Sequence, residues 1–192
     1  MGAAPLLGQS SRGMTENGYD VTIAATPDQA ASSLVKGETD LAALPINLAA
    51  NLYQKLDGDL QILAVNTLGV LYVLENGDSV QTVQDLAGKT LYATGQGSTP
   101  EYILNAILAG NGLQNVTVEY LSEHSELAAW LVEGKADLGM LPEPNVSVAL
   151  QKSQQLRRAL DLTAAWEALY PDAPLVQGCI VAKKSLIETR CV

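Results

Sequence analysis

The sequence repeats itself once, at a separation of 97 residues, and this repeat limits what the chain can fold into. Residues 34–55 (LVKGETDLAALPINLAANLYQK) match residues 131–152 (LVEGKADLGMLPEPNVSVALQK) without a gap, and 9 of the 22 positions are identical. Solenoid repeats have periods of roughly 20–50 residues, so this period is too long for a solenoid. The repeat predicts two similar lobes.

Each copy reads as strand, helix, strand, helix, strand. The short apolar runs 41–44 and 138–141 are typical of buried strands. Segments rich in β-branched and aromatic residues lie at matching places on either side, which predicts further strands. These segments are 19–24 opposite 116–121, and 60–65 opposite 157–162. Helices between such strands favour βαβ crossovers and a mainly parallel sheet.

Capping residues mark the ends of the predicted helices. Thr26 is expected to cap a helix that begins at Pro27, with Gln29 completing a capping box. Ser122 is expected to cap the equivalent helix of the second copy. Gly37 and Gly134 stand where a left-handed residue closes a helix.

The segment between the two copies predicts three more elements. Residues 69–75 (GVLYVLE) read as a strand, and residues 82–87 read as a short helix that Gly88 closes. Residues 89–94 then form the first strand of the second lobe.

The net charge of −10 makes nucleic-acid binding improbable, because an acidic chain repels phosphate backbones. Two cysteines, Cys179 and Cys191, and a single histidine exclude a zinc cluster of the usual spacing. Nothing in the sequence supports a disulfide between the two cysteines. No run of about 18 apolar residues predicts a membrane span. We therefore expect no metal and no cofactor.

Ligands of open parallel sheets bind beyond the carboxyl ends of the strands, and that rule selects particular loops. The first follows the strand 89–94 and opens a helix, with Gly97, Ser98, Thr99 and Tyr102 as candidate ligand-binding residues. Thr99 is expected to cap this helix, whose free N–H groups favour a carboxylate, sulfonate or phosphate group. The alternative is a plain capped helix start.

The first copy has a similar helix start at Gly2-Ala3-Ala4-Pro5, expected to run to about residue 12. Ala3 and Ala4 are candidate ligand-binding residues there. The two helix starts, one from each lobe, are expected to face each other across a cleft.

Further candidates follow other predicted strands: Pro45, Asn47, Asn66, Thr67, His124 and Glu143. Asn66 and Asn47 are the strongest, although Asn47 has the alternative role of a helix cap. His124 is read either as a surface residue or as a side chain reaching into the cleft. Glu143 either binds a cationic or hydroxyl group or is solvated.

The two tryptophans have different expected roles. Trp130 lies on the apolar side of a predicted helix and is expected in the core, whereas Trp166 follows a strand and is a candidate wall of the cleft. No nucleophile motif, phosphate-binding loop or Rossmann fingerprint is present, so catalytic residues are not expected.

Several segments together resemble a known group of proteins. VNTLGVLYVLENGD, VQDLAGKTLYATGQGSTPEY and the paired G-x-x-D-L-x-x-L-P motifs are similar to solute-binding proteins of ABC transporters of the nitrate, sulfonate, taurine and thiamine-precursor type. The resemblance implies an α/β fold of the type II periplasmic-binding-protein kind. It has two similar lobes with mainly parallel sheets flanked by helices, and the first lobe here is expected to be truncated at both ends.

The resemblance also implies how the chain divides. Residues 1–87 and 176–192 are expected to form lobe 1, and residues 88–175 lobe 2. Crossings are expected near 87–89 and 172–178. The strand 176–182 is then expected to return to lobe 1 and pair near 69–75.

The implied function is passive capture of a small molecule, not catalysis. The partners are the ligand and a membrane permease of an ABC importer. The protein is expected to be a bacterial monomer outside the cytoplasm, in the periplasm or as a lipoprotein, although the chain shows no export signal. The alternatives are a small-molecule lyase and a ligand-sensing domain on the same fold.

Overall fold

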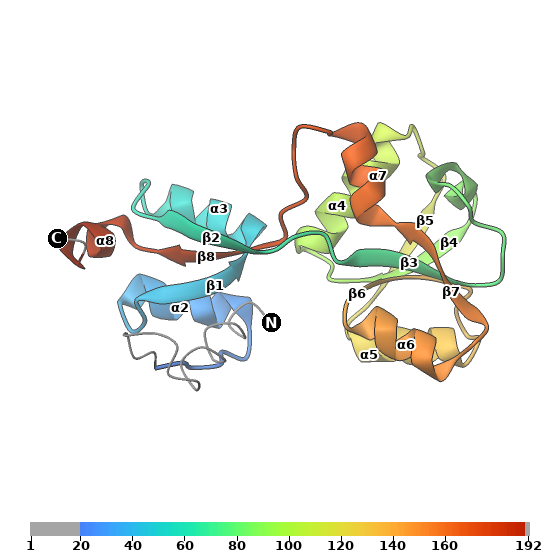
Figure 1. Ribbon diagram of the computed structural model, residues 1–192, viewed down its shortest axis with the longest axis horizontal. Helices are drawn as coiled ribbons and strands as arrows, with labels where there is room; N and C mark the ends of the chain where they lie inside the picture. The colour runs from blue at the N-terminus through green and yellow to red at the C-terminus, as the bar shows by residue number, and fades with distance from the viewer. Residues whose placement is uncertain (1–19, 191–192) are drawn as a thin grey trace. The chain divides into compact units, whose positions relative to one another are not determined.

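The computed structural model describes residues 20–190, and side chains up to residue 188 (Figure 1). The chain forms two compact units. Unit 1 holds the described residues up to Leu68 and from Val176 onward, and unit 2 is Gly69–Leu175. Unit 1 contains α2 (Pro27–Lys36), β1 (Leu41–Pro45), α3 (Ile46–Lys55), β2 (Gln61–Thr67), β8 (Gly178–Ala182) and α8 (Lys184–Arg190).

Unit 2 holds the remaining elements of the described chain. They are β3 (Leu71–Asn76), the 3-10 helix η1 (Val83–Leu86), β4 (Thr90–Thr94), α4 (Thr99–Gly110), β5 (Thr117–Leu121), α5 (His124–Val132), β6 (Leu138–Pro142), α6 (Asn145–Lys152), β7 (Leu156–Asp161) and α7 (Leu162–Leu169). Helix α2 begins 97 residues before α5, and β1 begins 97 residues before β6. The internal repeat is therefore a repeat of structure.

Each sheet has one strand that runs against the others. In unit 1 the order is β1-β8-β2, and β8 is antiparallel to both neighbours, so β1 and β2 run the same way. In unit 2 the order is β5-β4-β6-β3-β7, and β3 is antiparallel to β6 and β7. Strands β5, β4 and β6 are parallel. The α/β fold with two sheets flanked by helices is confirmed, but the sheets are mixed, because four of the six strand pairings in the described chain are antiparallel. Each reversed strand is the first strand after the chain passes between units.

Two expectations about β3 are wrong. This strand pairs with β6 and β7 and not with β8, which instead lies between β1 and β2. The chain accordingly passes from unit 1 to unit 2 after Leu68 and not after residue 87. It returns to unit 1 after Leu175, inside the expected range 172–178. The physical reason is burial: Leu71, Val73 and Leu74 have no exposed surface, and a strand buried on both faces belongs inside a sheet.

The predicted helix ends are partly correct. The Thr26 side chain accepts a hydrogen bond from the Gln29 N–H, and Gly37 closes α2 with a φ of 75°. Gly134 also has a positive φ, of 70°. Ser122 is not a cap, because Glu123 holds that position at the start of α5 without a side-chain bond.

The strand expected at 19–24 does not form over its described residues, 20–24. Its counterpart β5 is a strand because β4 lies beside it, and the described sheet of unit 1 contains only β1, β8 and β2. Backbone without a neighbouring strand gains no ladder of hydrogen bonds. Ile23 is 86% exposed there. The helix expected at about 2–12 lies outside the described residues.

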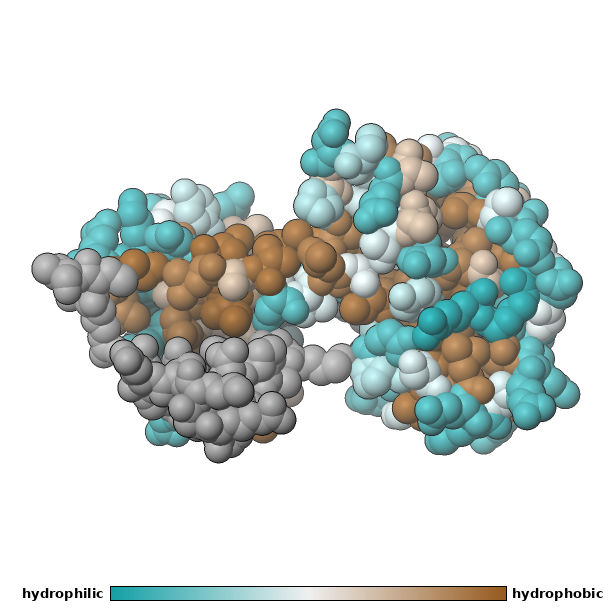
Figure 2. Space-filling model, in the orientation of Figure 1, coloured by the Kyte–Doolittle hydropathy of each residue, from teal (hydrophilic) through white to brown (hydrophobic). Residues whose placement is uncertain are grey.

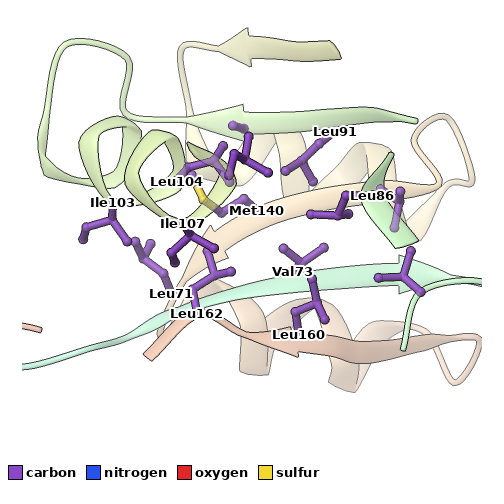
Figure 3. Packing of buried hydrophobic residues seen from close by; sticks show 14 of the residues in the cluster. Leu71, Val73, Leu86, Leu91, Ile103, Leu104, Ile107, Met140, Leu160 and Leu162 are labelled. Atoms are coloured by element: carbon purple, nitrogen blue, oxygen red, sulfur yellow. The ribbon is translucent and has the colours of Figure 1, made fainter. Parts of the chain in front are cut away.

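Unit 2 packs helices on both faces of its sheet. On one face, residues of α4 and α7 pack on β3, β4 and β6, as Figure 3 shows for Leu104, Ile107 and Leu162 beside Val73 and Met140. On the other face, residues of α5 and α6 form a second buried cluster. Unit 1 has one such cluster among its described residues, between its sheet and helices α2 and α3. No helix of the described chain is long and apolar enough to cross a membrane.

Candidate ligand-binding site

Three parallel strands of unit 2 end at the same edge of the sheet and bring two distant residues together. Thr94 is the last residue of β4, and His124 begins α5 just after the neighbouring strand β5. Thr94 Oγ1 and His124 Nδ1 share a hydrogen bond of 2.6 Å. Thr94 is almost fully buried, so this contact fixes the imidazole ring at the sheet edge. The structure thus favours a positioned His124 over a free surface side chain.

The charge state of His124 depends on its partial burial. Loss of solvent lowers the pKa of the imidazole, and the nearby Glu123 carboxylate raises it by a smaller amount, so the pKa lies below its ordinary value. The ring is therefore neutral at physiological pH. A neutral imidazole that accepts the Thr94 hydroxyl at Nδ1 carries its proton on Nε2, which then acts as a donor.

The loop between β4 and α4 is folded against its own helix. The Gly97 N–H donates to the Glu101 carboxylate at 2.6 Å, and the Ser98 hydroxyl donates to the Gly95 carbonyl at 2.6 Å. Gly95 and Gly97 have φ values of 83° and 73°, which only glycine adopts without strain. The start of α4 therefore already presents a backbone donor to an anionic oxygen.

Two predicted residues of this helix have other positions than expected. Thr99 is not the cap: it is the first residue of α4, it is buried, and Ser98 precedes it at the cap position without a side-chain bond to the helix. Tyr102 is 59% exposed, whereas Ile103 and Leu104, which follow it in α4, are buried.

Glu143 follows β6 at the same edge, but its carboxylate already has protein partners. Arg158 Nη2 donates to Oε1 at 2.6 Å, and the Ser147 N–H donates to Oε2 at 3.1 Å. The Arg158 guanidinium also lies 4.9 Å from the centre of the Tyr72 ring. These contacts join β6, β7, β3 and α6, so Glu143 is engaged in the structure and is not merely solvated.

In unit 1 the candidate residues lie where β1 and β2 end on either side of β8. Pro45 and Thr67 both pair with Gly178, the first residue of β8. Asn47 is the second residue of α3 and is half-buried, while Pro45 stands at the cap position, so Asn47 is not the helix cap. Three chain segments distant in sequence thus meet at one edge.

Two polar side chains lie close to the backbone of Gly178 at this edge. The Thr67 hydroxyl donates to Asn66 Oδ1 at 3.2 Å. A Cβ atom on Gly178 would lie 2.9 Å from Asn66 Oδ1 and 3.1 Å from Thr67 Oγ1. Gly178 therefore allows both polar side chains to approach the backbone. The Gln177 side-chain nitrogen is buried here without a hydrogen-bond partner.

The structure thus gathers the predicted residues into one group in each unit. The unit 2 group contains Gly97, Ser98, Thr99, His124 and Glu143, with Tyr102 further along α4. The unit 1 group contains Pro45, Asn47, Asn66 and Thr67. Ala3 and Ala4 lie outside the described residues. The cleft expected between facing helix starts stays a prediction.

The tryptophans and the described cysteine were also assigned roles from the sequence. Trp130 packs against the core cluster of α5 and α6, edge-on to Tyr92, as expected. The Trp166 indole N–H donates to the Ala173 carbonyl, and its ring lies 4.7 Å from that of Tyr170, which makes Trp166 part of the α7 packing. Cys179 is a buried free thiol, and burial raises its pKa.

Sequence reasoning missed Thr94, Glu101, Gln177 and Gly178. Thr94 carried a usable signal, because it is a polar residue at the carboxyl end of a strand, as Asn66 is. Gln177 and Gly178 lie at the start of β8, which runs in reverse to its neighbours, and a rule that selects the carboxyl ends of parallel strands overlooks them. Within residues 20–188, no group of three or more His, Cys, Asp or Glu side chains is placed to hold a metal ion.

The sequence matches one known protein family, and the structure is similar to several solved structures. The family model described as "ABC transporter, phosphonate, periplasmic substrate-binding protein" matches residues 14–180. The structure is similar to that of an ABC transporter from Parabacteroides distasonis, with a TM-score of 0.72 and 29% identity over 92% of this chain and 60% of that one. A search of curated proteins by sequence found no match.

Two solved sulfonate-binding proteins share the fold. The periplasmic aliphatic sulphonate binding protein of Escherichia coli gives a TM-score of 0.73 at 20% identity, over 98% of this chain and 62% of that one. The alkanesulfonate-binding protein of Xanthomonas axonopodis pv. citri, bound to MOPS, gives 0.57 at 22% identity, over 97% and 62%. The chain spans about three fifths of the length of these proteins. By the match over residues 14–180, it belongs to the phosphonate family of periplasmic substrate-binding proteins of ABC transporters.

Proposed function

We propose that this chain captures a small anionic molecule outside the cytoplasm and delivers it to the permease of an ABC importer. The observation that carries the proposal is the edge of unit 2, where the Gly97 N–H beside the start of α4 holds the carboxylate of the chain's own Glu101, an internal anion at the place that a ligand anion would take. A helix start of this kind favours anions through its free N–H groups and its dipole. His124, held just after the next strand by Thr94, adds a neutral donor at Nε2 in the tautomer whose Nδ1 accepts the Thr94 hydroxyl.

The chemistry of both groups favours a sulfonate, phosphonate or carboxylate. The donors are backbone N–H groups, hydroxyls, amides and an imidazole, and none of the predicted residues is a lysine or arginine. The one acid among the predicted residues, Glu143, is paired with Arg158. Neutral donors bind an anion without an opposite charge, which suits a ligand that must later be released. Membership of a phosphonate-binding family and the fold shared with two sulfonate-binding proteins support the same ligand class.

Passive capture is favoured over catalysis. The titratable residues at the unit 2 edge are already engaged, His124 with Thr94 and Glu143 with Arg158. The reading as a lyase requires that the ligand leave the protein chemically changed.

A thermal-shift screen with native mass spectrometry tests the proposal. The probes are methylphosphonate, ethanesulfonate, taurine and acetate, with a matched cationic probe, ethylammonium, as the control. We expect at least one anion, and not the cation, to raise the melting temperature in a saturable way and to be recovered unchanged. A cooperative melt that no anion shifts would contradict the proposal, and recovery of a converted product would favour the lyase.

A further inference from the structure

Asparagine followed by glycine is a chemically labile pair, and this chain contains three such pairs. They are Asn17-Gly18, Asn76-Gly77 and Asn111-Gly112, and the first lies outside the described residues. The side-chain amide of asparagine reacts with the backbone nitrogen of the next residue, and glycine has no Cβ to hinder that approach. Asparagine is therefore among the thermolabile residues. The folded structure controls the rate at each pair, because the reaction needs freedom of both the side chain and the backbone.

The pair at Asn111 is restrained by hydrogen bonds. Its Nδ2 donates to the Ile107 carbonyl at 2.8 Å, and its Oδ1 accepts from Gln84 Nε2 at 2.9 Å. The attacking atom at this pair is the Gly112 nitrogen, whose N–H donates to the Ala109 carbonyl at 3.0 Å. Asn111 therefore has to break bonds to its own helix α4 and to η1 before it can react.

The side chain of Asn76 is not restrained in this way. No hydrogen bond holds it among the residues that the structure describes, and its amide nitrogen lies near Gly134, where an added Cβ would be 3.5 Å away. Asn76 is the last residue of β3, and the exposed Gly77 begins the turn that follows. Gly77 has a φ of 143°, so this turn itself requires the glycine that makes the pair labile.

Water, the second reactant, reaches this turn. Figure 1 shows the chain passing from β3 to η1 along the outside of unit 2. In Figure 2 the visible surface of unit 2 is mainly hydrophilic where β3 ends and β7 begins. Gly77, Asp78 and Ser79 are all exposed. Solvent therefore has access to a cyclic intermediate that forms at Asn76.

We propose that Asn76 deamidates in the folded protein, ahead of Asn111. The Gly77 nitrogen gives up its proton and attacks Cγ of Asn76. The bond between Cγ and Nδ2 breaks, and Nδ2 leaves with that proton as ammonia. A water molecule then opens the cyclic succinimide. Opening at Cγ gives aspartate, whereas opening at the backbone carbonyl gives isoaspartate, in which the chain continues through Cγ.

Isoaspartate at this position is expected to disturb the turn after β3. The Asn76 N–H donates to the Asp137 carbonyl at 2.8 Å, and Asn76 pairs with Leu156, so the chain up to this residue is fixed in the sheet. The additional backbone carbon therefore displaces Gly77, whose carbonyl accepts a hydrogen bond from Arg157 Nε at 3.0 Å. Arg157 also forms the ion pair between β7 and β3. The altered chain is thus expected to melt at a lower temperature.

Peptide mapping by mass spectrometry tests the proposal on the full 192-residue chain, stored in mildly alkaline buffer at body temperature. Each conversion appears as the exchange of an amide for an acid in one peptide, with aspartate and isoaspartate as separate peaks. Because Asn111 first has to break two side-chain hydrogen bonds, we expect Asn76 to convert at least about tenfold faster. Conversion of Asn111 as fast as Asn76 would overturn the proposal.

The same incubation in urea separates structure from sequence. Unfolding releases both pairs, so Asn76 and Asn111 are expected to convert at similar rates there. A preference for Asn76 that persists in urea would come from the neighbouring sequence and would overturn the structural explanation. So would a folded chain in which Asn76 stays intact while the unfolded chain converts.

Q84A is the matched test of the protecting bonds. It removes the hydrogen bond to Asn111 Oδ1 by changing an exposed side chain of η1, and it leaves the turn at Asn76 untouched. We expect Asn111 to convert several times faster in Q84A, with the rate at Asn76 unchanged. An unchanged rate at Asn111 would contradict protection by hydrogen bonds and overturn the proposed order.

Freshly prepared N76D separates the new charge from the altered backbone. It adds the carboxylate at residue 76 without the additional backbone carbon. We expect N76D to melt closer to the wild type than the isoaspartate fraction isolated from stored protein does. Equal melting temperatures for N76D and the isoaspartate fraction would assign the loss to charge and overturn the proposed backbone effect.

Discussion

Glu75 and Arg157 form an ion pair of 2.5 Å that joins β3 to β7 across 82 residues of sequence. The Glu75 carboxylate is 3% exposed and also accepts hydrogen bonds from Ser79 and from the Val80 N–H. Arg157 donates in addition to the carbonyls of Gly77 and Val80. This network closes the turn after β3 and fixes the strand in the sheet of unit 2.

Removal of the Glu75 charge is expected to destabilise the protein. E75Q leaves Arg157 without its buried partner, and we expect a loss of about 1–3 kcal/mol in the free energy of unfolding, because the guanidinium keeps partial access to water. Urea unfolding measures this loss. The control is D78N, whose carboxylate lies 3.4 Å from the same guanidinium but is 85% exposed. It is expected to change stability by less than about 0.5 kcal/mol.

The same pair predicts how stability changes in acid. Burial raises the Glu75 pKa, but the hydrogen bonds from Ser79 and Val80 and the charge of Arg157 outweigh it, so the folded pKa lies below the ordinary value. Its contribution is therefore complete above the unfolded pKa, about 4.3, and is lost as the pH falls through the folded pKa. The stability gap between wild type and E75Q is expected to shrink below about pH 4. A gap that stays constant down to pH 3 would contradict this assignment.

His124 is a base and Glu75 is an acid, but both are expected to make the folded protein less stable as the pH falls. Burial holds its folded pKa below the ordinary value, so the unfolded chain takes up a proton first as the pH falls. Stability is expected to decrease as the pH falls below about 6.5. Because the chain has one histidine, the ring-proton resonances of that imidazole give its pKa directly by NMR titration.

Two variants test the causes of that pKa. E123Q removes the charge that raises it, so the midpoint is expected to fall further. T94V removes the hydrogen bond of 2.6 Å between Thr94 and His124, and the resulting change in the midpoint measures how much this bond contributes to the pKa of His124. A wild-type midpoint above about 6.5 would contradict burial as the dominant cause.

Much of the fold was predictable because it depends on local pattern. The repeat located α2, β1, α5 and β6, since apolar runs and capping residues act within a few positions. The partners of β3 were not predictable, because pairing is decided by which strand is buried on both faces. The contact of Thr94 with His124 was missed for a similar reason: it spans 30 residues and requires β4 and β5 to be adjacent.

Isothermal titration calorimetry of the full chain with methylphosphonate and ethanesulfonate tests the central claim most directly. We predict saturable binding of at least one anion with a stoichiometry of one, weakened about 10- to 100-fold in H124A, which loses a donor to a charged group. The ethylammonium control is predicted not to bind. A chain that melts cooperatively but releases no heat with either anion, or whose affinity H124A leaves unchanged, would contradict anion capture at the carboxyl edge of unit 2.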